Sequence, residues 1–398
     1  MTIELLAPAG DLERAKIALD YGADAVYVGG RRFSLRARAS NFELQDIAEL
    51  VEYAHKDDHK VYVTVNMIPH EDDMEGLREY LIDLNMIHVD AIIVASLYIA
   101  SLSKEVAPTI QVFLSTQLSI TNSKTMDYFK QFKIDRVVLA RELNMHQIET
   151  VISESSLPIE VFIHGGMCVN YSGRCTLSNE MTLRDANRGG CAQSCRWNYS
   201  VYYKDSLVSD KDPLFTMGSK DLLTLNHIAD FIKLGVCSLK IEGRMKSAYY
   251  IAVIVKVYRT LIDAVYENKL SDDLIDRLNL ELKQAESRAT FDGFLSALPN
   301  QNGQIYQVNA EGVSQQFIGM IKATKPGWAL VEMRNHLGLN QNLEVFSAHQ
   351  ANLTFINTSM IDENGIELII ANQPLTLVWL KIPFAVSIGD FIRRQGAL

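Results

Sequence analysis

Four of the five cysteines of this chain lie within one short segment, residues 168–195. They are Cys168, Cys175, Cys191 and Cys195, whereas Cys237 stands apart. Thiolates are soft ligands that bind zinc or iron–sulfur clusters, and four of them complete either kind of site. Successive cysteines are separated by six, fifteen and three residues, which is not the paired pattern of a zinc ribbon. The segment therefore predicts a metal site, with an iron–sulfur cluster favoured over zinc.

Disulfide bonds, a reactive thiol and buried structural cysteines are the alternative interpretations. The first residues have neither the basic start nor the long apolar core of a signal peptide, so we expect a cytoplasmic protein. Thiols stay reduced in the cytoplasm, and clustered cysteines there more often indicate metal binding or catalysis.

Composition narrows the class of protein. The chain has 398 residues, of which 48% are hydrophobic and 22% charged, as in ordinary globular proteins. No apolar run reaches the roughly 18 residues of a membrane-spanning helix, so we expect no membrane segment. The net charge of −10 argues against broad, non-specific nucleic-acid binding, but it leaves room for a local basic site.

Short aliphatic runs alternate with longer amphipathic segments through the first 245 residues. Eight of these runs predict strands, at residues 5–9, 25–28, 60–65, 91–95, 111–114, 136–140, 159–163 and 238–241. Such runs are typical of parallel strands that are buried on both faces. The count of eight favours an α/β fold of the (β/α)8 TIM-like barrel type over an open, doubly wound sheet.

The chain divides into two predicted domains. The barrel domain covers residues 1–295 and carries the cysteines in an insertion, at about residues 165–236, between the seventh and eighth strands. Residues 296–316 are predicted to be a linker, and residues 317–398 a small all-β barrel domain with short alternating strands. Because barrel active sites lie at the C-terminal ends of the strands, we expect the cysteines above the barrel mouth.

Polar residues follow most of the predicted barrel strands. An arginine-rich loop after the second strand includes Arg36 and Arg38, which suit phosphate or carboxylate ligands, although a solvated loop is the alternative. The other candidates for substrate binding are Asn41, Asn66, Gln117, Arg141, Lys240 and Arg244. His164, Glu142 and Glu242 are candidates for proton transfer, and buried ion pairs that hold the barrel are the alternative for the two glutamates.

Longer motifs give a family resemblance. They are Glu160-Val-Phe-Ile-His-Gly-Gly-Met-Cys168, Tyr171-Ser-Gly-Arg-Cys-Thr-Leu-Ser178 and Arg184-Asp-Ala-Asn-Arg-Gly-Gly-Cys-Ala-Gln-Ser-Cys-Arg-Trp197. Together with the opening residues 4–11 and the stretches 39–42, 219–222, 239–246 and 389–394, they resemble the collagenase-like peptidase U-thirty-two (U32) family over nearly the whole chain.

This resemblance implies an activity other than the family name suggests. The sequence is most similar to members that hydroxylate tRNA without molecular oxygen, use a [4Fe–4S] cluster and form 5-hydroxyuridine at the wobble position in a prephenate-dependent pathway. The implied partners are tRNA and a small carboxylate co-substrate, with prephenate as the candidate. A related member acts on a cytidine of ribosomal RNA. Many tRNA members carry a further cysteine where this chain has Leu223, so Cys195 is the expected fourth ligand and Cys237 the reserve.

Three hypotheses follow. The first is an iron–sulfur RNA hydroxylase. The second is a peptidase, but the sequence has neither His-Glu-x-x-His nor Gly-x-Ser-x-Gly, and a cysteine that ligates a cluster cannot also act as a nucleophile. The third is a zinc-stabilised binding module without catalysis. The sequence leaves an oligomer or a partner subunit open.

Overall fold

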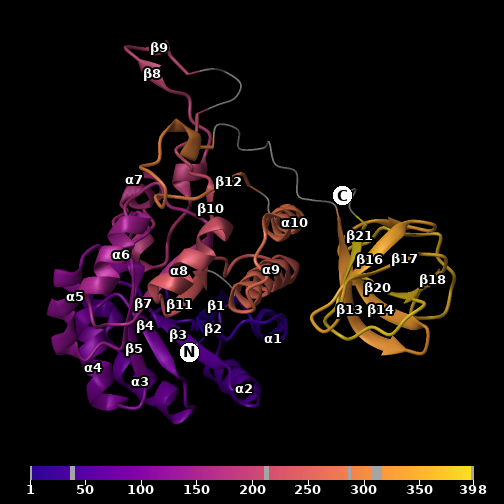
Figure 1. Ribbon diagram of the computed structural model, residues 1–398, viewed down its shortest axis with the longest axis horizontal. Coiled ribbons are helices and arrows are strands. Elements are labelled where there is room, and N and C mark those ends of the chain that lie inside the picture. Colours follow the sequence, from indigo (N-terminus) through magenta and orange to yellow (C-terminus); the bar gives the residue numbers. More distant parts are fainter. Residues whose placement is uncertain (1, 36–40, 210–214, 286–287, 306–315, 396–398) are drawn as a thin grey trace.

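A closed parallel barrel forms the main body of the protein, as a computed structural model of the chain shows (Figure 1). The structure describes residues 2–35, 41–209, 215–285, 288–305 and 316–395. The barrel strands are β1 (Glu4–Pro8), β2 (Ala25–Gly29), β3 (Lys60–Val65), β4 (Ala91–Val94), β5 (Gln111–Leu114), β6 (Arg136–Val138), β7 (Ile159–Gly165) and β11 (Ser238–Ile241). Each pairs in parallel with its neighbour, and β11 pairs with both β1 and β7, which closes the barrel. The predicted (β/α)8 fold is confirmed.

Helices surround this barrel. They are α1 (Leu12–Asp20), α2 (Leu44–His55), α3 (Leu77–Met86), α4 (Leu97–Val106), α5 (Ser123–Phe129), α6 (Met145–Glu154), α8 (Ile228–Leu234) and α9 (Ala248–Tyr266). Asp11 caps α1 by accepting a hydrogen bond from the backbone N–H of Arg14. A further helix, α10 (Asp272–Lys283), follows α9 and packs on it.

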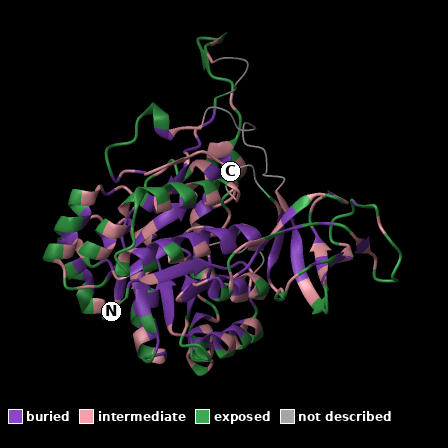
Figure 2. Ribbon diagram, turned by 45° about the vertical axis from the view of Figure 1, so that its right-hand side comes forward, coloured by how far each residue is buried: buried purple, intermediate pink, exposed green. Residues whose placement is uncertain are grey.

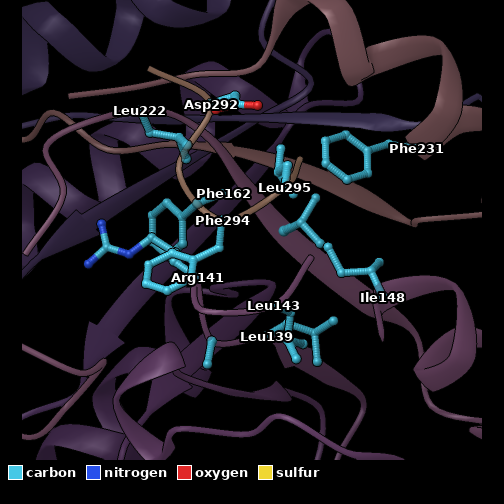
Figure 3. Close-up of a pocket in the computed structure, with 12 residues that line it drawn as sticks. Leu139, Arg141, Leu143, Ile148, Phe162, Leu222, Phe231, Asp292, Phe294 and Leu295 are labelled. Atoms are coloured by element: carbon cyan, nitrogen blue, oxygen red, sulfur yellow. The ribbon is translucent and has the colours of Figure 1, made fainter. Parts of the chain in front are cut away.

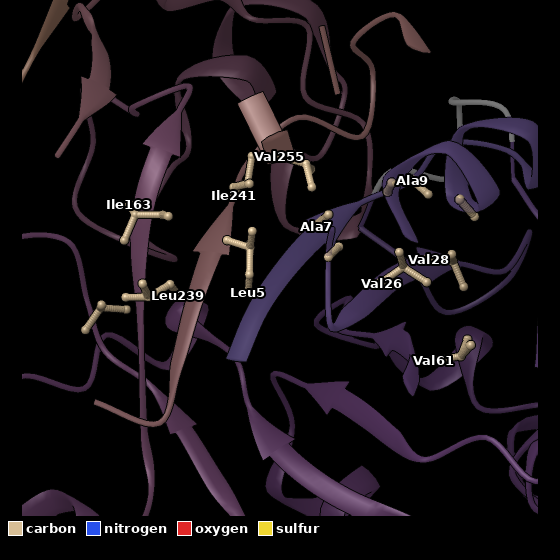
Figure 4. Close-up of a cluster of buried hydrophobic side chains, with 14 of the residues drawn as sticks. Leu5, Ala7, Ala9, Val26, Val28, Val61, Ile163, Leu239, Ile241 and Val255 are labelled. Carbon is tan, nitrogen blue, oxygen red and sulfur yellow. The ribbon is translucent and has the colours of Figure 1, made fainter. Parts of the chain in front are cut away.

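Alternating side chains of the strands fill two separate layers of core. Outward residues such as Leu5, Val26 and Ile241 join the helices in one large hydrophobic cluster (Figure 4). Inward residues such as Leu6, Tyr27 and Phe113 form a second cluster inside the barrel. Figure 2 shows the buried strands beneath helices whose outer faces are exposed. The two-residue period of a strand produces this division.

A charged network occupies the N-terminal part of the barrel interior. Glu160 accepts hydrogen bonds from Arg136 at 3.0 Å and from Lys240 at 2.8 Å, and Arg136 also pairs with Glu4. Tyr62 donates its hydroxyl hydrogen to Glu4 at 2.6 Å. These charges are buried and mutually paired, which is the arrangement that offsets their loss of hydration.

The insertion leaves β7 and returns to it. It contains α7 (Leu177–Thr182) and a hairpin of β8 (Tyr202–Tyr203) and β9 (Ser206–Leu207) that extends away from the barrel (Figure 1). It ends in β10 (Asp221–Leu223), which pairs antiparallel with the end of β7, and β12 (Thr290–Phe291) then pairs with β10. Part of the segment predicted as a linker, residues 296–316, pairs with the insertion: residues 303–305 hydrogen-bond to residues 218–220.

The second domain is an antiparallel sheet that curves into a half-barrel. Its strand order is β17 (Leu353–Ile356), β16 (Asn342–Phe346), β21 (Phe391–Arg394), β13 (Phe317–Lys325), β14 (Trp328–Met333), β20 (Leu377–Lys381) and β18 (Met360–Ile361). A separate pair is formed by β15 (Leu337–Gly338) and β19 (Ile370–Ala371). In the described residues the two outer strands do not pair with each other, so the barrel predicted for this domain is open.

Aromatic side chains join the two domains. Tyr249 of α9 stacks on Phe317 with ring centroids 4.6 Å apart, and Tyr21 stacks on Phe346. Arg393, which is buried, pairs with Glu281 of α10 and with Glu344 of its own domain. The β domain is therefore fixed against the α1, α9 and α10 side of the barrel. No helix within the described ranges combines the length and the apolar character that crossing a membrane requires.

Candidate active site at the barrel mouth

Polar side chains at the ends of β2, β3 and β11 meet across the barrel mouth. Arg244 is buried and donates to the hydroxyl oxygens of Ser34 at 2.9 Å and Thr64 at 2.8 Å. A Cβ atom on Gly29 would lie 2.3 Å from a terminal nitrogen of Arg244, so only glycine leaves space for this guanidinium. Arg244 thus lies at the mouth, where the sequence predicts it.

Asn66 and Gln117 form a second polar pair at the mouth. The amide nitrogen of Asn66 donates to the side-chain oxygen of Gln117 at 2.8 Å, and its own oxygen accepts from the backbone N–H of Leu35. The structure therefore joins Asn66 to Gln117 and to Leu35, whose neighbour Ser34 contacts Arg244. Asn41 lies beside Phe42, whose backbone bridges to Gly30 after β2, whereas Arg36 and Arg38 fall outside the described residues.

Arg141 and Glu142 hold the cysteine segment onto the barrel. Arg141 donates to the backbone carbonyl of Gly166 at 2.7 Å, two residues before Cys168. The carboxylate of Glu142 accepts from both the backbone N–H and the hydroxyl of Ser172, each at 2.8 Å. These contacts account for both residues structurally, and they place the first part of the segment at the end of β6.

Further contacts extend the cysteine segment across the mouth. The φ of Gly173 is +76°, and a Cβ atom there would lie 1.9 Å from the backbone oxygen of Gln117. Arg188 forms a two-point ion pair with Asp73, in the loop after β3, at 2.7 and 2.9 Å. The segment therefore spans from the β5 and β6 ends to the β3 side, above the mouth, as expected.

Cys195 has the other three clustered cysteines among its charged neighbours. Burial raises the pKa of the Cys195 thiol, and negative charge on each of the other three clustered cysteines raises it further. Cys168 and Cys191 are exposed, Cys175 is partly buried, and all five cysteines are free thiols. Within the described part of the chain, however, no three His, Cys, Asp or Glu side chains are arranged tightly enough to hold a metal ion. The donor set fits a thiolate-bound metal chemically, but its side chains are not drawn together into a coordination shell.

Cys237 belongs to the opposite end of the barrel. It directly precedes β11, and its backbone N–H bonds to the carbonyl of Ile159 at the start of β7. Burial raises the pKa of its thiol to about 12, with Arg136, Glu160 and Glu4 as its charged neighbours. The prediction that Cys237 could serve as the reserve fourth ligand is therefore wrong, because the barrel separates Cys237 from the other four cysteines.

His164 faces away from the mouth. Its ring packs against Tyr250 and Tyr258 of α9, and its Nδ1 lies 3.3 Å from the Tyr258 hydroxyl. Burial, followed by the charge of Lys246, lowers the pKa of His164 to about 3. A neutral, enclosed imidazole on the helix side of β7 suits packing better than proton transfer.

Lys240 and Glu242 lie two residues apart at the C-terminal end of β11. Lys240 is buried, pairs with Glu160 and lies over the ring of Tyr27 at 4.6 Å. Glu242 lies nearer the mouth, where one carboxylate oxygen is 3.3 Å from the Tyr27 hydroxyl. Of the predicted proton-transfer residues, Glu242 has the position that best fits that role.

Two features of the insertion were not singled out from sequence. One is a group of cations around the buried Asp221: Arg196 of the insertion, with Lys246 and Arg288 from outside it. Asp221 belongs to the family-like stretch 219–222, and Arg196 directly follows Cys195. Both residues therefore lie in motifs that carry the family resemblance. The other is a run of exposed aromatic rings, at Tyr171, Trp197, Tyr202, Tyr203 and Phe215.

A small cavity lies behind the mouth, between β6, β7, α6 and α8. Its lining includes Arg141, Phe162, Leu222 and Phe294 (Figure 3). Its volume of about 20 Å³ is enough for about one water molecule. The cavity is too small for a substrate, so the exposed mouth beneath the cysteines remains the candidate site.

Comparison with known proteins assigns both domains of the chain to one family. The model of Peptidase family U32 matches residues 10–305, and that of the Peptidase family U32 C-terminal domain matches residues 313–393. The chain is 40% identical to "tRNA hydroxylation protein P1" of Bacillus subtilis, over 98% of this chain and 94% of that protein. It is 32% identical to "tRNA hydroxylation protein P" of Escherichia coli, over 96% of this chain and 94% of that protein. It is also 41% identical to the "23S rRNA 5-hydroxycytidine C2501 synthase" of Escherichia coli, over 67% of this chain and 40% of that protein.

Proposed function

Because this chain belongs to peptidase family U32, and matches RNA-hydroxylation members over both of its domains, we propose that it is an RNA-hydroxylating enzyme whose substrate is tRNA. The observation that carries this proposal is the 40% identity to a tRNA hydroxylation protein, which extends over 98% of the chain. That range includes the cysteine segment, the polar mouth and the β domain. We place the enzyme in the cytoplasm, where its substrate is found.

The proposed cofactor is a [4Fe–4S] cluster bound by Cys168, Cys175, Cys191 and Cys195. Supporting this are four free thiols in one segment, the nearness of the other three to Cys195 and the anchoring of the segment above the mouth. Such a cluster supplies one-electron chemistry when bound. Zinc is the alternative metal for the same thiols.

The chain's own residues would orient the reacting base below the cysteines. Arg244, Asn66 and Gln117 offer fixed donors and acceptors at the mouth, and Glu242 offers a carboxylate there for proton transfer. The exposed rings of the insertion suit stacking on unpaired bases, which is the common way in which proteins read single-stranded RNA. A loop of tRNA would thus meet both a stacking surface and the polar side chains of the mouth. We further propose uridine C5 as the target and prephenate as the carboxylate co-substrate.

The peptidase alternative finds no support at the mouth. His164, the imidazole nearest in sequence to Cys168, contacts α9 tyrosines, whereas Cys168 is exposed. The thiol–imidazole pair that a cysteine peptidase needs is therefore not formed by these two residues.

Nucleoside mass spectrometry of tRNA tests the proposal. Cells that lack this chain are expected to lose one hydroxylated nucleoside, and the full chain is expected to restore it. The C191S variant should fail to restore it, whereas the C237S variant, altered at the opposite end of the barrel, should succeed. An unchanged tRNA profile together with a lost hydroxycytidine in ribosomal RNA would redirect the proposal to ribosomal RNA, and no change in either RNA would contradict it.

A further inference from the structure

The carboxylate of Asp221 lies at the centre of three cationic side chains. Its Oδ1 is 3.5 Å from Arg196 and 3.5 Å from Arg288, and its Oδ2 is 3.9 Å from Lys246. The Asp221 side chain is 7% exposed, whereas those of Arg196 and Arg288 are 16% and 33% exposed. The carboxylate is thus enclosed while the guanidinium groups reach solvent.

Three separate parts of the chain supply these cations. Arg196 follows Cys195 in the insertion, Arg288 follows α10, and Lys246 follows β11 at the mouth. Arg196 is also fixed by the backbone carbonyls of Met167 at 3.0 Å and Ser219 at 3.4 Å. The cations are therefore positioned by the fold beside the cysteine segment.

The pairing with Asp221 is loose for charged groups. Charge-assisted N–H···O bonds are about 2.7–2.9 Å long. The ion pair between Lys240 and Glu160 inside the barrel has this length, at 2.8 Å. Arg196 and Arg288 instead share one carboxylate oxygen at 3.5 Å each. One carboxylate cannot neutralise two guanidinium groups, so the pair retains positive charge and donors for another acceptor.

There is also room and a further donor beside the two arginines. A Cβ atom on Gly166 would meet nothing nearer than Arg196 at 3.9 Å and Asp221 at 4.0 Å. The hydroxyl of Ser219, a residue only 8% exposed, has no hydrogen-bond partner among the described residues. Buried polar atoms normally have a partner, and this hydroxyl belongs to the residue whose backbone carbonyl accepts from Arg196, so it can donate to a ligand held there.

We propose that Arg196, Arg288 and Lys246 form a binding site for an oxyanion, either a phosphate or a carboxylate group, next to the cysteine segment. Asp221 lies between the cations and competes with the anion. The biological meaning of the site rests on the proposed function, since tRNA supplies phosphates and a co-substrate supplies carboxylates. The binding of an anion by these residues does not depend on the proposed function.

Calorimetric titration of the anaerobically purified full chain tests the site, with inorganic phosphate and malonate as separate probes. Loss of one guanidinium in R288Q should weaken binding about tenfold or more. The D221N variant should bind about tenfold or more tightly, because a negative charge that competes for the same guanidinium groups is removed. The matched control is R78Q, which alters an exposed arginine that is paired with Glu105 outside the mouth.

The salt dependence of tRNA binding identifies the source of the anion. If a tRNA phosphate occupies the site, R288Q should lower the slope of log affinity against log salt by about 1. If a small carboxylate occupies it, R288Q should lose malonate binding and keep the slope. Absence of phosphate and malonate binding in the unaltered chain, or equal affinities in R288Q and R78Q, would overturn the proposal. Probe binding with an unchanged nucleoside profile in cells would keep the anion site and reject the RNA substrate.

Discussion

The carboxylate of Glu142 accepts two hydrogen bonds of 2.8 Å from Ser172, one from its backbone N–H and one from its hydroxyl. Glu142 follows β6, and Ser172 lies between Cys168 and Cys175. A single side chain thus links the barrel to the part of the insertion that carries the first two proposed ligands.

Replacing Glu142 by Gln should loosen the cysteine segment. A neutral amide cannot accept both hydrogen bonds with the strength of a carboxylate, and hydrogen bonds to charged groups contribute roughly 1.5–3 kcal/mol. Hydrogen exchange of residues 168–175 should therefore become faster by about tenfold or more, while barrel strands keep their protection. E149Q, on the exposed side of α6, is the control. Equal exchange in both variants would show that the link does not order the segment.

Metal content should depend on the four clustered cysteines and not on the fifth. After anaerobic purification, C191S should lose most of its iron and acid-labile sulfide, because a thiolate ligand is removed. C237S should keep both, because Cys237 lies at the N-terminal end of the barrel among Glu4, Arg136 and Glu160. Iron loss in C237S alone would reverse the assignment, and one zinc per chain without iron would favour the zinc site.

The lowered pKa of His164 should make the stability of the protein depend on pH. This pKa is lowered from 6.5 to about 3 by burial, so the unfolded state binds a proton that the folded state excludes. The free energy of unfolding should therefore fall as pH decreases from about 6.5 toward 3, by up to about 1.4 kcal/mol per pH unit.

The H164Q variant isolates this contribution, because glutamine is polar and does not titrate. Urea unfolding between pH 4 and 6.5 should show a shallower fall for H164Q than for the unaltered chain. The exposed His146 offers the control H146Q, whose pH profile should match that of the unaltered chain. Identical slopes in all three proteins would mean that His164 titrates normally and is open to solvent.

Arg136 should contribute strongly to stability. In R136M, the buried carboxylates of Glu4 and Glu160 lose a cationic partner, and breaking such a buried pair costs about 3–5 kcal/mol. Urea unfolding should show this loss, whereas R78M at the surface should change stability by less than about 0.5 kcal/mol. A small effect of R136M would mean that Lys240 alone compensates the two carboxylates.

The barrel and the position of the cysteine segment were predictable because both follow from periodicity and topology. Buried parallel strands give aliphatic runs, and a segment after the seventh strand must begin at the C-terminal face. The roles of individual polar residues were less accessible. Glu142 precedes Ser172 by thirty residues, and sequence does not show which side chain meets its carboxylate.

The side-chain direction of His164 also could not be predicted from sequence. Glu160 and Phe162 point into the barrel, so simple alternation would place His164 inside as well. The pairing register between β7 and β11 shifts after Lys240, so that Ile241 pairs with His164. A shift of one residue turns a side chain to the opposite face, and His164 accordingly packs on α9. The openness of the β domain was likewise not evident, because strand patterns do not reveal whether the outer strands pair.

The antiparallel pairing of β10 with β7 has a consequence for how this protein is built. Leu222 lies opposite Gly165, so the chain leaves the barrel and re-enters it at neighbouring positions. The residues between them form an insertion whose two ends lie side by side, so its length does not affect the pairing of β7 with β11. The module that carries the thiols can thus lengthen, shorten or exchange its hairpin while the barrel beneath it keeps the same closure.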